Sequence, residues 1–366
     1  MENKNEWRKI KLGEVAEYIS EKINSSILER KNYISTENML PNNNGITLAS
    51  SIPINTKVNK FQEEDILISN IRTYLKKIWK ATFNGGSSND VLIIRKTKNN
   101  ILSKYIYYTL TQDSFFNYAT ATSKGTKMPR GDKDSIMNYE FLLPSLQFQK
   151  KIVKILSDID NKIELNNKIN NNLEEQCITI FKKMFPQIFY GSFNVGNYLK
   201  PKRGKNLLSK NAILGDIPVV AGGLEPAIYH NKSNTQSPVI TISASGANAG
   251  FIRLWHTPVW SSDSSYIDYS VSKYIYFWYV FLKLRQNEIY DLQSGSAQPH
   301  IYPKHLEELS IDELDIKLVK NFNEITSSFF EKIGKNNIEN KKLSNLKNYL
   351  LPKLMNGKID VENIEL

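Results

Sequence analysis

Basic, aromatic and amide side chains are concentrated between Leu67 and Lys133. This stretch contains twelve Lys or Arg, three Asp and no Glu, and the whole chain has a formal net charge of +11. Lys and Arg contact phosphates, whereas Asn and Arg can pair with the edges of adenine and guanine. A merely solvated basic surface would not gather the charge in one place. The sequence therefore predicts a nucleic-acid-binding surface.

Two segments of this stretch supply the expected contacts of the first half of the chain. The expected reading edge follows a strand-like run and consists of Asn70, Arg72, Thr73, Tyr74, Lys76 and Lys77. For Lys76 and Lys77 we expect contacts to phosphates rather than to bases. A Gly-containing loop is expected to clamp the nucleic-acid backbone through Lys124, Lys127 and Arg130.

The second half of the chain offers a less basic set of candidates. One group aligns with the reading edge, and a second group lies in a basic run that could also be a plain solvated loop. The aligned group is Ser243, Ser245, Asn248 and Arg253, with Gln298 further on, and the basic run contributes Lys202, Arg203 and Lys205. Since the two halves share few of these side chains, we expect them to read different base sequences.

Catalytic motifs are not found in the sequence. It lacks the phosphate-binding patterns G-x-x-x-x-G-K-[ST] and G-x-G-x-x-G after a strand. Cys177 is expected to be a small buried residue of a helix, and the four histidines do not have the spacing of a zinc site. An acidic segment at 312–315 could suggest a nuclease, but acidic residues also favour a helix start. We expect no catalysis and no metal in this chain.

The location of the protein is expected to be the cytoplasm. A single cysteine fits a reducing compartment, and no apolar run reaches the ~18 residues that a membrane span needs. We therefore expect no membrane contact.

Two long helices with the same heptad pattern are expected to position the candidate residues. They cover 152–184 and 322–354, 170 positions apart, and each pattern is interrupted by two asparagines at matching places. These are Asn166 and Asn170 in the first copy and Asn336 and Asn340 in the second. Polar residues in such a seam fix register, so we expect an antiparallel pair aligned by these four side chains.

The helix ends can also be placed. The first helix should start after Ser145 and stop before Pro186, and the second should run from about Ile316 to Gly357. Pro352 predicts a kink or a break in its last turns. Ser103 and Ser272 are expected to cap two shorter helices.

Each long helix follows a globular region, and these two regions also repeat. Ile66–Ser69 resembles Ile240–Ser243 at an offset of 174, and Gly125 and Pro129 correspond to Gly295 and Pro299 at 170. Their mixed strand and helix patterns predict two α+β domains joined by a pair of long antiparallel helices, with an approximate two-fold repeat. The expected division is 1–145, 146–186, 187–315 and 316–366.

Several motifs resemble those of the DNA-specificity subunits of type I restriction–modification systems. The opening at 7–15 resembles the start of this family, and Leu351–Ile359 resembles its carboxyl end. The segments 125–130 and 295–300 resemble the close of each target-recognition domain. The chain departs from the pattern at 181–185, which lacks the proline and glycine found at 351–359.

The resemblance implies a division of labour. Each globular domain would read one half of a split double-stranded DNA target, and the helix pair would set the gap and dock two methyltransferase subunits. Those subunits would bind S-adenosylmethionine, and restriction subunits that use ATP and magnesium could join them. This chain itself would hold no cofactor. Two alternatives are the specificity subunit of a related methyltransferase–nuclease of another type, and a coiled-coil scaffold that binds no nucleic acid.

Overall fold

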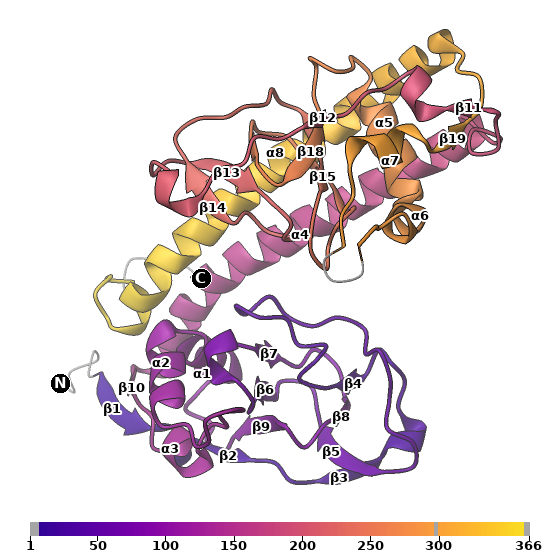
Figure 1. Ribbon diagram of the computed structural model, residues 1–366. Helices are drawn as coiled ribbons and strands as arrows, with labels where there is room; N and C mark the ends of the chain where they lie inside the picture. The colour runs from indigo at the N-terminus through magenta and orange to yellow at the C-terminus, as the bar shows by residue number, and fades with distance from the viewer. Residues whose placement is uncertain (1–6, 296–298, 362–366) are drawn as a thin grey trace. The chain divides into compact units, whose positions relative to one another are not determined.

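The computed structural model describes residues 7–295 and 299–361 and has a mixed α+β architecture (Figure 1). The chain forms two compact units. Unit 1 comprises Met1–Ile163 and Lys342–Leu366, and unit 2 comprises Glu164–Lys341. Each unit therefore contains one globular domain together with a part of each of two long helices. Within the described residues, no helix is long and apolar enough to cross a membrane.

The described part of the globular domain of unit 1, from residue 7 onward, contains ten strands, three α-helices and short 3-10 turns. The strands are β1 (Arg8–Lys11), β2 (Ala16–Tyr18), β3 (Lys22–Asn24), β4 (Tyr33–Ile34), β5 (Lys57–Phe61), β6 (Ile66–Ser69), β7 (Ile78–Lys80), β8 (Gly85–Ser87), β9 (Val91–Lys96) and β10 (Glu140–Leu143). The helices are α1 (Ser103–Leu110), α2 (Asp113–Ala121) and α3 (Lys133–Met137), and the 3-10 turns include η1 (Leu12–Glu14) and η3 (Thr73–Leu75).

Two four-stranded sheets and a two-stranded ribbon build this domain. The first sheet is antiparallel with the order β2-β9-β6-β7, and the second has the order β3-β5-β8-β4 with β4 and β8 parallel. The ribbon pairs β1 with β10. Every residue of β6 is buried, as are the first four of β9, because both strands are continuous apolar runs in the middle of their sheet.

The globular domain of unit 2 has a matching set of elements. Its strands are β11 (Phe193–Asn194), β12 (Lys202–Arg203), β13 (Ile217–Val220), β14 (Ile228–His230), β15 (Val239–Ser243), β16 (Ile252–Trp255), β17 (Trp260–Ser261), β18 (Ser264–Ile267) and β19 (Ser310–Ile311). Its helices are α5 (Ile275–Leu284), α6 (Gln286–Asp291) and α7 (Pro303–Glu307), and η4 covers Val195–Asn197.

The strand orders confirm the internal repeat. The order β12-β18-β15-β16 repeats β2-β9-β6-β7, and the ribbon β11-β19 repeats β1-β10. The parallel pair β13 and β17 repeats β4 and β8. The second domain departs from the first in its smaller sheet, which has three strands in the order β14-β13-β17 where the first domain has four. The duplicated frame is therefore kept while its surroundings differ.

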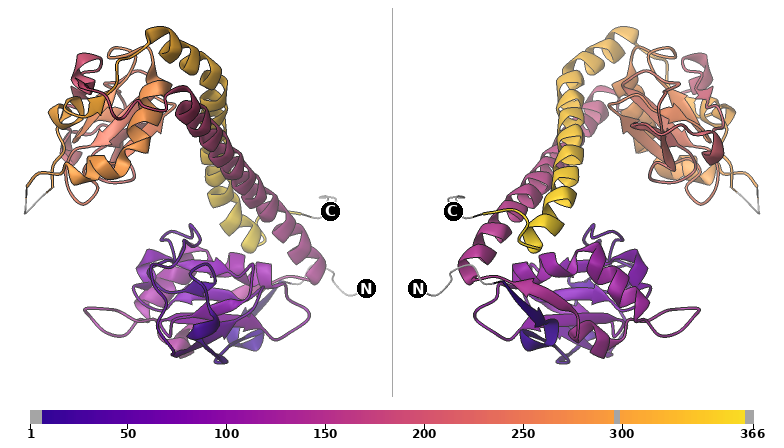
Figure 2. Two further views of the ribbon diagram at one scale, coloured as in Figure 1. Left: turned by 90° about the vertical axis from the view of Figure 1, so that its right-hand side faces the viewer. Right: turned by 90° about the vertical axis from the view of Figure 1, so that its left-hand side faces the viewer.

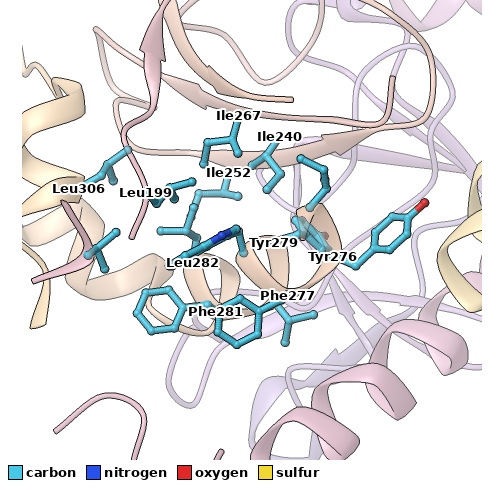
Figure 3. Packing of buried hydrophobic residues seen from close by; sticks show 14 of the residues in the cluster. Leu199, Ile240, Ile252, Ile267, Tyr276, Phe277, Tyr279, Phe281, Leu282 and Leu306 are labelled. Carbon is cyan, nitrogen blue, oxygen red and sulfur yellow. The ribbon is translucent and has the colours of Figure 1, made fainter. Parts of the chain in front are cut away.

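Helix α5 forms the centre of the core of unit 2 (Figure 3). Its first eight residues are all buried. Leu282 lies on the side of the sheet residues, whereas Phe277 and Phe281 lie on the opposite side of the helix. The ring of Phe277 is 5.1 Å from that of Phe185. A helix whose entire surface is apolar is buried on all sides. Helix α5 therefore packs between the sheet and the long helices.

The long helices are α4 (Leu146–Met184) and α8 (Ile316–Met355), and Figure 2 shows α4 without interruption. Both start where the sequence predicted. In unit 2 they are antiparallel, as expected, because Phe181 lies 5.3 Å from Phe322 while Asn166 donates to Asn340. In unit 1 the Lys347 ammonium binds Asp160 at 2.6 Å.

The break expected in the second long helix at Pro352 was wrong, and so were the caps expected at Ser103 and Ser272. Helix α8 is not broken at Pro352 but continues to Met355, where buried Leu354 and Met355 pack into the core of unit 1. Proline removes one hydrogen bond there, and this packing compensates for it. Ser103 is the first residue of α1 and not its cap, and α5 begins after Ser272.

The short helices are instead capped by side chains of the long helices. In unit 1 the Gln149 side chain, on α4, accepts from the Leu102 amide at the start of α1 at 3.0 Å. In unit 2 the Asn323 side chain, on α8, accepts from the Tyr276 amide in the first turn of α5 at 3.1 Å. Since the free amides of a helix start need acceptors, each long helix fixes the first turn of a domain helix.

Candidate nucleic-acid interface

In unit 1, main-chain hydrogen bonds bring together the two predicted contact segments. We call residues 70–77 the reading loop and residues 124–131 the clamping loop. The Arg72 amide donates to the Pro129 carbonyl at 2.9 Å, and the Gly131 amide donates to the Asn70 carbonyl at 3.1 Å. Lys124 and Arg130 exchange two bonds of 2.9 Å, which close the clamping loop on itself. Segments separated by about fifty residues thus form one surface.

The exposed side chains of this surface are mainly cationic. Tyr74 is 52% exposed, and the Lys124 and Arg130 side chains are 80% and 57% exposed. Arg72 and Lys127 are also exposed. This combination of cations with an accessible aromatic ring suits contact with phosphates and bases.

Three of the predicted reading residues face inward. Asn70 is 8% exposed and Thr73 is 2% exposed. The Thr73 hydroxyl hydrogen-bonds to that of Thr120 at 2.9 Å. The Lys77 ammonium donates to the Thr36 carbonyl at 2.6 Å, and burial together with the charge of Arg72 lowers its pKa. These side chains hold the reading loop in place.

The turn η3 gives the reading loop a defined backbone. Arg72 and Lys76 flank it, and both have φ of +52°, in the left-handed region. Side chains other than glycine pay roughly 1 to 3 kcal/mol for such a conformation, which persists only when the surroundings hold it. The Lys76 ammonium binds the Asp113 carboxylate at 2.7 Å. The strain and the anchors together present Tyr74 at the tip of the loop.

A neighbouring segment was missed in the sequence. The amides of Asn42 and Asn43 donate to the Leu75 and Lys76 carbonyls, each at 2.9 Å. The Asn43 side chain donates to the Thr111 carbonyl at 3.1 Å, whereas Asn42 is exposed. Three asparagines followed by Gly45 signal a turn, but nothing in the sequence places that turn beside the reading loop.

Unit 2 repeats the main-chain frame with different side chains. The Gly246 amide donates to the Pro299 carbonyl at 3.0 Å, and the Ile301 amide donates to the Ala244 carbonyl at 2.9 Å. Gly246, with φ of +80°, takes the place of Arg72. Ser294 and His300 exchange two bonds, as Lys124 and Arg130 do in unit 1. The frame is the same, and the groups that it presents are not.

The predicted residues of unit 2 divide into buried, paired and exposed ones. Ser243 is buried, and its hydroxyl donates to the Ala221 carbonyl at 3.3 Å, whereas the Ser245 hydroxyl donates to Asp263. Lys205 is exposed and Asn248 half-buried. Gln298 lies outside the described residues.

The other three predicted cations of unit 2 have partners. Lys202 donates to the Ser270 hydroxyl at 3.0 Å, and Arg203 binds Asp263 at 2.5 Å. The Arg253 guanidinium lies 4.1 Å from the centre of the Trp255 ring and donates to the Leu224 carbonyl at 2.8 Å. The predicted cations of this domain therefore lie on or just after β12 and on β16, and not in the segment equivalent to the clamping loop.

The predicted asparagines of the long helices lie in two separate hydrogen-bonded groups in unit 2, which we together call the asparagine network. Asn166 and Asn336 are each 1% exposed. Asn166 donates to Asn340 at 2.8 Å, and Asn336 donates to Asn170 at 2.8 Å. Asn170 in turn donates to Asn337 at 2.9 Å. Because an amide inside an apolar seam needs a partner at one fixed place, this network opposes a shift of one helix along the other.

Among residues 7–295 and 299–361, no three His, Cys, Asp or Glu side chains are grouped so that they could hold a metal ion. Cys177 is buried as predicted, and burial raises the pKa of its thiol to about 12.

Comparisons with known proteins agree with this arrangement. Residues 4–175 match the family described as type I restriction modification DNA specificity domain. The HindI specificity subunit of Haemophilus influenzae is 26% identical over 190 residues, which are 50% of this chain and 41% of that protein. The MjaIX specificity subunit of Methanocaldococcus jannaschii is 24% identical over 310 residues, 73% of this chain and 71% of that one.

The fold has a solved counterpart. The type I restriction–modification S subunit of M. genitalium superimposes with a TM-score of 0.60 over 97% of both chains, at 18% identity. The match covers 41% of the HindI specificity subunit and 46% of the MjaVIII specificity subunit of M. jannaschii. The chain therefore spans less than half the length of these two relatives. Residues 4–175 thus match the type I restriction modification DNA specificity domain, and the chain is similar to the specificity subunits of type I restriction enzymes.

Proposed function

We propose that this chain is the DNA-sequence-specificity subunit of a type I restriction–modification complex. Each globular domain reads one half of a split double-stranded DNA target. The observation that carries the proposal is the repeated main-chain frame, which presents Arg72, Lys124 and Arg130 in one domain and Gly246, Ser294 and His300 in the other. One frame with two sets of side chains is what a reader of two different half-sites needs.

The long helices set the gap between the half-sites and dock two methyltransferase subunits. The asparagine network supports the first role, because it fixes the register of α4 against α8. The names of the relatives support the second, since they are specificity subunits of type I restriction enzymes. S-adenosylmethionine belongs on the methyltransferase subunits, and ATP and magnesium belong on restriction subunits where these join. The chain itself contributes recognition and not catalysis.

Mapping methylated adenines tests the proposal. The chain is co-expressed with the methyltransferase encoded beside it, and methylation is mapped across the host genome. We expect one split motif with a fixed gap and two unlike halves. Scattered or absent methylation would contradict the proposed function, and a perfectly palindromic motif would contradict the reading of unlike halves.

An insertion separates the role of the helices from that of the domains. Four residues inserted after Asn166 lengthen α4 by about one turn, ~6 Å. We expect the gap in the motif to change while both half-sites stay the same. The matched control inserts the same four residues after Lys98, in the exposed loop before α1, and should leave the gap unchanged. An unchanged gap in the α4 variant would contradict the ruler role.

Salt dependence separates a DNA reader from a scaffold that binds no nucleic acid. Affinity for duplex DNA should fall steeply as salt rises, because each phosphate contact releases counterions. A chain that shows no salt-dependent binding to any duplex, alone or with its methyltransferase, would support the scaffold.

A further inference from the structure

Asp90 and Asp263 occupy equivalent places in the two domains. Asp90 lies between β8 and β9, and Asp263 lies between β17 and β18. The Asp90 carbonyl accepts from the amide of Asn70, the first residue after β6, at 2.8 Å. The Asp263 carbonyl accepts from the amide of Ala244, the first residue after β15, at 3.1 Å. The repeated frame thus places one carboxylate beside the loop that follows the central strand of each sheet.

Both carboxylates bind an arginine, although the arginines come from different segments. Arg130, of the clamping loop, binds Asp90 with 3.0 Å between Nη2 and Oδ1. Arg203, of β12, binds Asp263 with 2.5 Å between the same kinds of atom. Asp263 also accepts from the hydroxyl of Ser245, which aligns with the reading loop. The carboxylate is the constant element, and the source of the arginine varies.

These pairs do not serve stability in an obvious way. The arginine side chains are 57% and 38% exposed, and those of the aspartates are 37% and 33% exposed. Exposed ion pairs contribute little to folding. A carboxylate on a DNA-facing surface also repels phosphates. Two equivalent carboxylates at this place therefore call for another explanation.

A paired arginine differs from a free one in the way it meets DNA. An unpaired arginine is a mobile cation that any phosphate satisfies. The Asp partner restricts its rotamers and orients the planar guanidinium, so that less entropy is lost when it makes bidentate bonds to a guanine edge. The carboxylate also offsets one positive charge, which weakens binding to any duplex. Both effects favour sequence discrimination over plain affinity.

We propose that Asp90 and Asp263 are specificity-determining positioning residues, which hold Arg130 and Arg203 for base reading and restrain their contact with phosphates. The inference rests on the proposed function, and it changes the role of Arg130, for which the sequence favoured a backbone contact. It assigns one half-site to each aspartate.

The test uses Asp90→Asn and Asp263→Asn in the full chain co-expressed with its methyltransferase. Methylation by the unchanged chain first defines the split motif; if no split motif appears, the proposed function fails before the variants are considered. We expect Asp90→Asn to relax one half of the motif and Asp263→Asn only the other. Discrimination between a cognate and an altered half-site should fall about tenfold or more, as for loss of one bidentate contact.

Binding to a duplex without the motif gives the second readout. Each variant should bind this duplex more tightly than the unchanged chain at low salt, and the salt slope should steepen by up to about 0.9 because one more phosphate is neutralised. Arg130→Gln and Arg203→Gln should relax the same halves but weaken this binding. The opposite signs distinguish a positioning carboxylate from a residue that merely supports the fold.

Matched controls remove one exposed carboxylate elsewhere in each domain. These are Glu29→Gln, which loses a pair with Lys31, and Glu308→Gln, which loses a pair with Lys304. Both should keep the two halves of the motif and the salt slope. The inference is overturned if Asp90→Asn and Asp263→Asn leave both halves intact, or if each lowers methylation at all sites without relaxing either half.

Discussion

Replacing the buried amides of the helix pair tests whether they act as a register lock. The variants are Asn170→Leu, Asn336→Leu and the two together. In the native protein the Asn336 amide donates to the Asn170 oxygen at 2.8 Å, and the side chains are 1% and 8% exposed. Either single change therefore leaves a polar atom of the other residue without its partner in a nearly dry seam.

The structure allows the size of the effect to be worked out. Each single change loses the hydrogen bond between Asn336 and Asn170, about 1 kcal/mol, and leaves a buried group unpaired at about 1 to 3 kcal/mol. Asn170→Leu also loses the bond from its amide to the exposed Asn337, a loss that the double variant shares and that therefore cancels in the coupling. Asn336→Leu also removes the Asn336 Oδ1 atom, which is buried without a protein partner, so its cost should be at the lower end. The double variant places two apolar residues in an apolar seam and should be near neutral. We expect a coupling free energy of about 1 to 3 kcal/mol.

Urea denaturation of the full chain, followed by circular dichroism, measures the free energy of unfolding for the four proteins of the cycle. The exposed pair Asn172 and Gln176, hydrogen-bonded along one face of α4, gives a control cycle with Leu at both positions. Its coupling should stay within about 0.5 kcal/mol. Equal destabilisation by the single and double variants, with no coupling, would refute the reasoning that these amides need one another.

Three further predictions concern single side chains. Lys127→Gln should lower the slope of log affinity against log salt for duplex binding by about 0.9, while Lys77→Gln leaves this slope unchanged. The reason is that Lys127 is exposed, whereas Lys77 donates to an internal carbonyl. Equal effects of the two variants in titrations at several salt concentrations would contradict the prediction. Cys177 should resist iodoacetamide at pH 8 until the chain unfolds, since its thiol is buried with a pKa of about 12. Rapid labelling of the native chain, measured by mass spectrometry, would show that the thiol is not buried. The Lys124 ammonium, with the Ser135 amide, lowers the pKa of Asp132 to about 2, so the Asp132 carboxylate stabilises the fold above about pH 4 and loses its contribution as the pH falls toward 2. Lys124→Met should raise the titration midpoint of the Asp132 carboxyl group, observed by carbon-13 NMR. An unchanged midpoint would remove Lys124 as the cause.

The long helices could be predicted because their signals are local. Ser145 and Pro186 delimit α4, and a heptad seam with repeated asparagines is visible over 152–184 without knowledge of any other segment. The central strands were predictable for the same reason, since Ile66–Ser69 and its copy Ile240–Ser243 are short segments rich in β-branched residues.

The candidate site was predicted in its segments but not in its side-chain directions. Lys77 turns inward because its acceptor is a carbonyl 41 positions earlier, and no local pattern encodes that distance. The caps of α1 and α5 come from Gln149 and Asn323, 47 positions from the amides that they accept. Ser103 fitted the local preference for a cap, but this tertiary partner took the role.

The hydrogen bonds that hold the reading and clamping loops together run between main-chain atoms in both domains. Every residue except proline supplies the same amide and carbonyl, so side chains on these loops can be exchanged without loss of the bonds that shape them. Arg72 and Gly246 occupy one such position with one backbone geometry and unlike chemistry. Under the proposed function, a new target sequence then requires only point substitutions on these loops, and each domain can acquire a new target independently of the other.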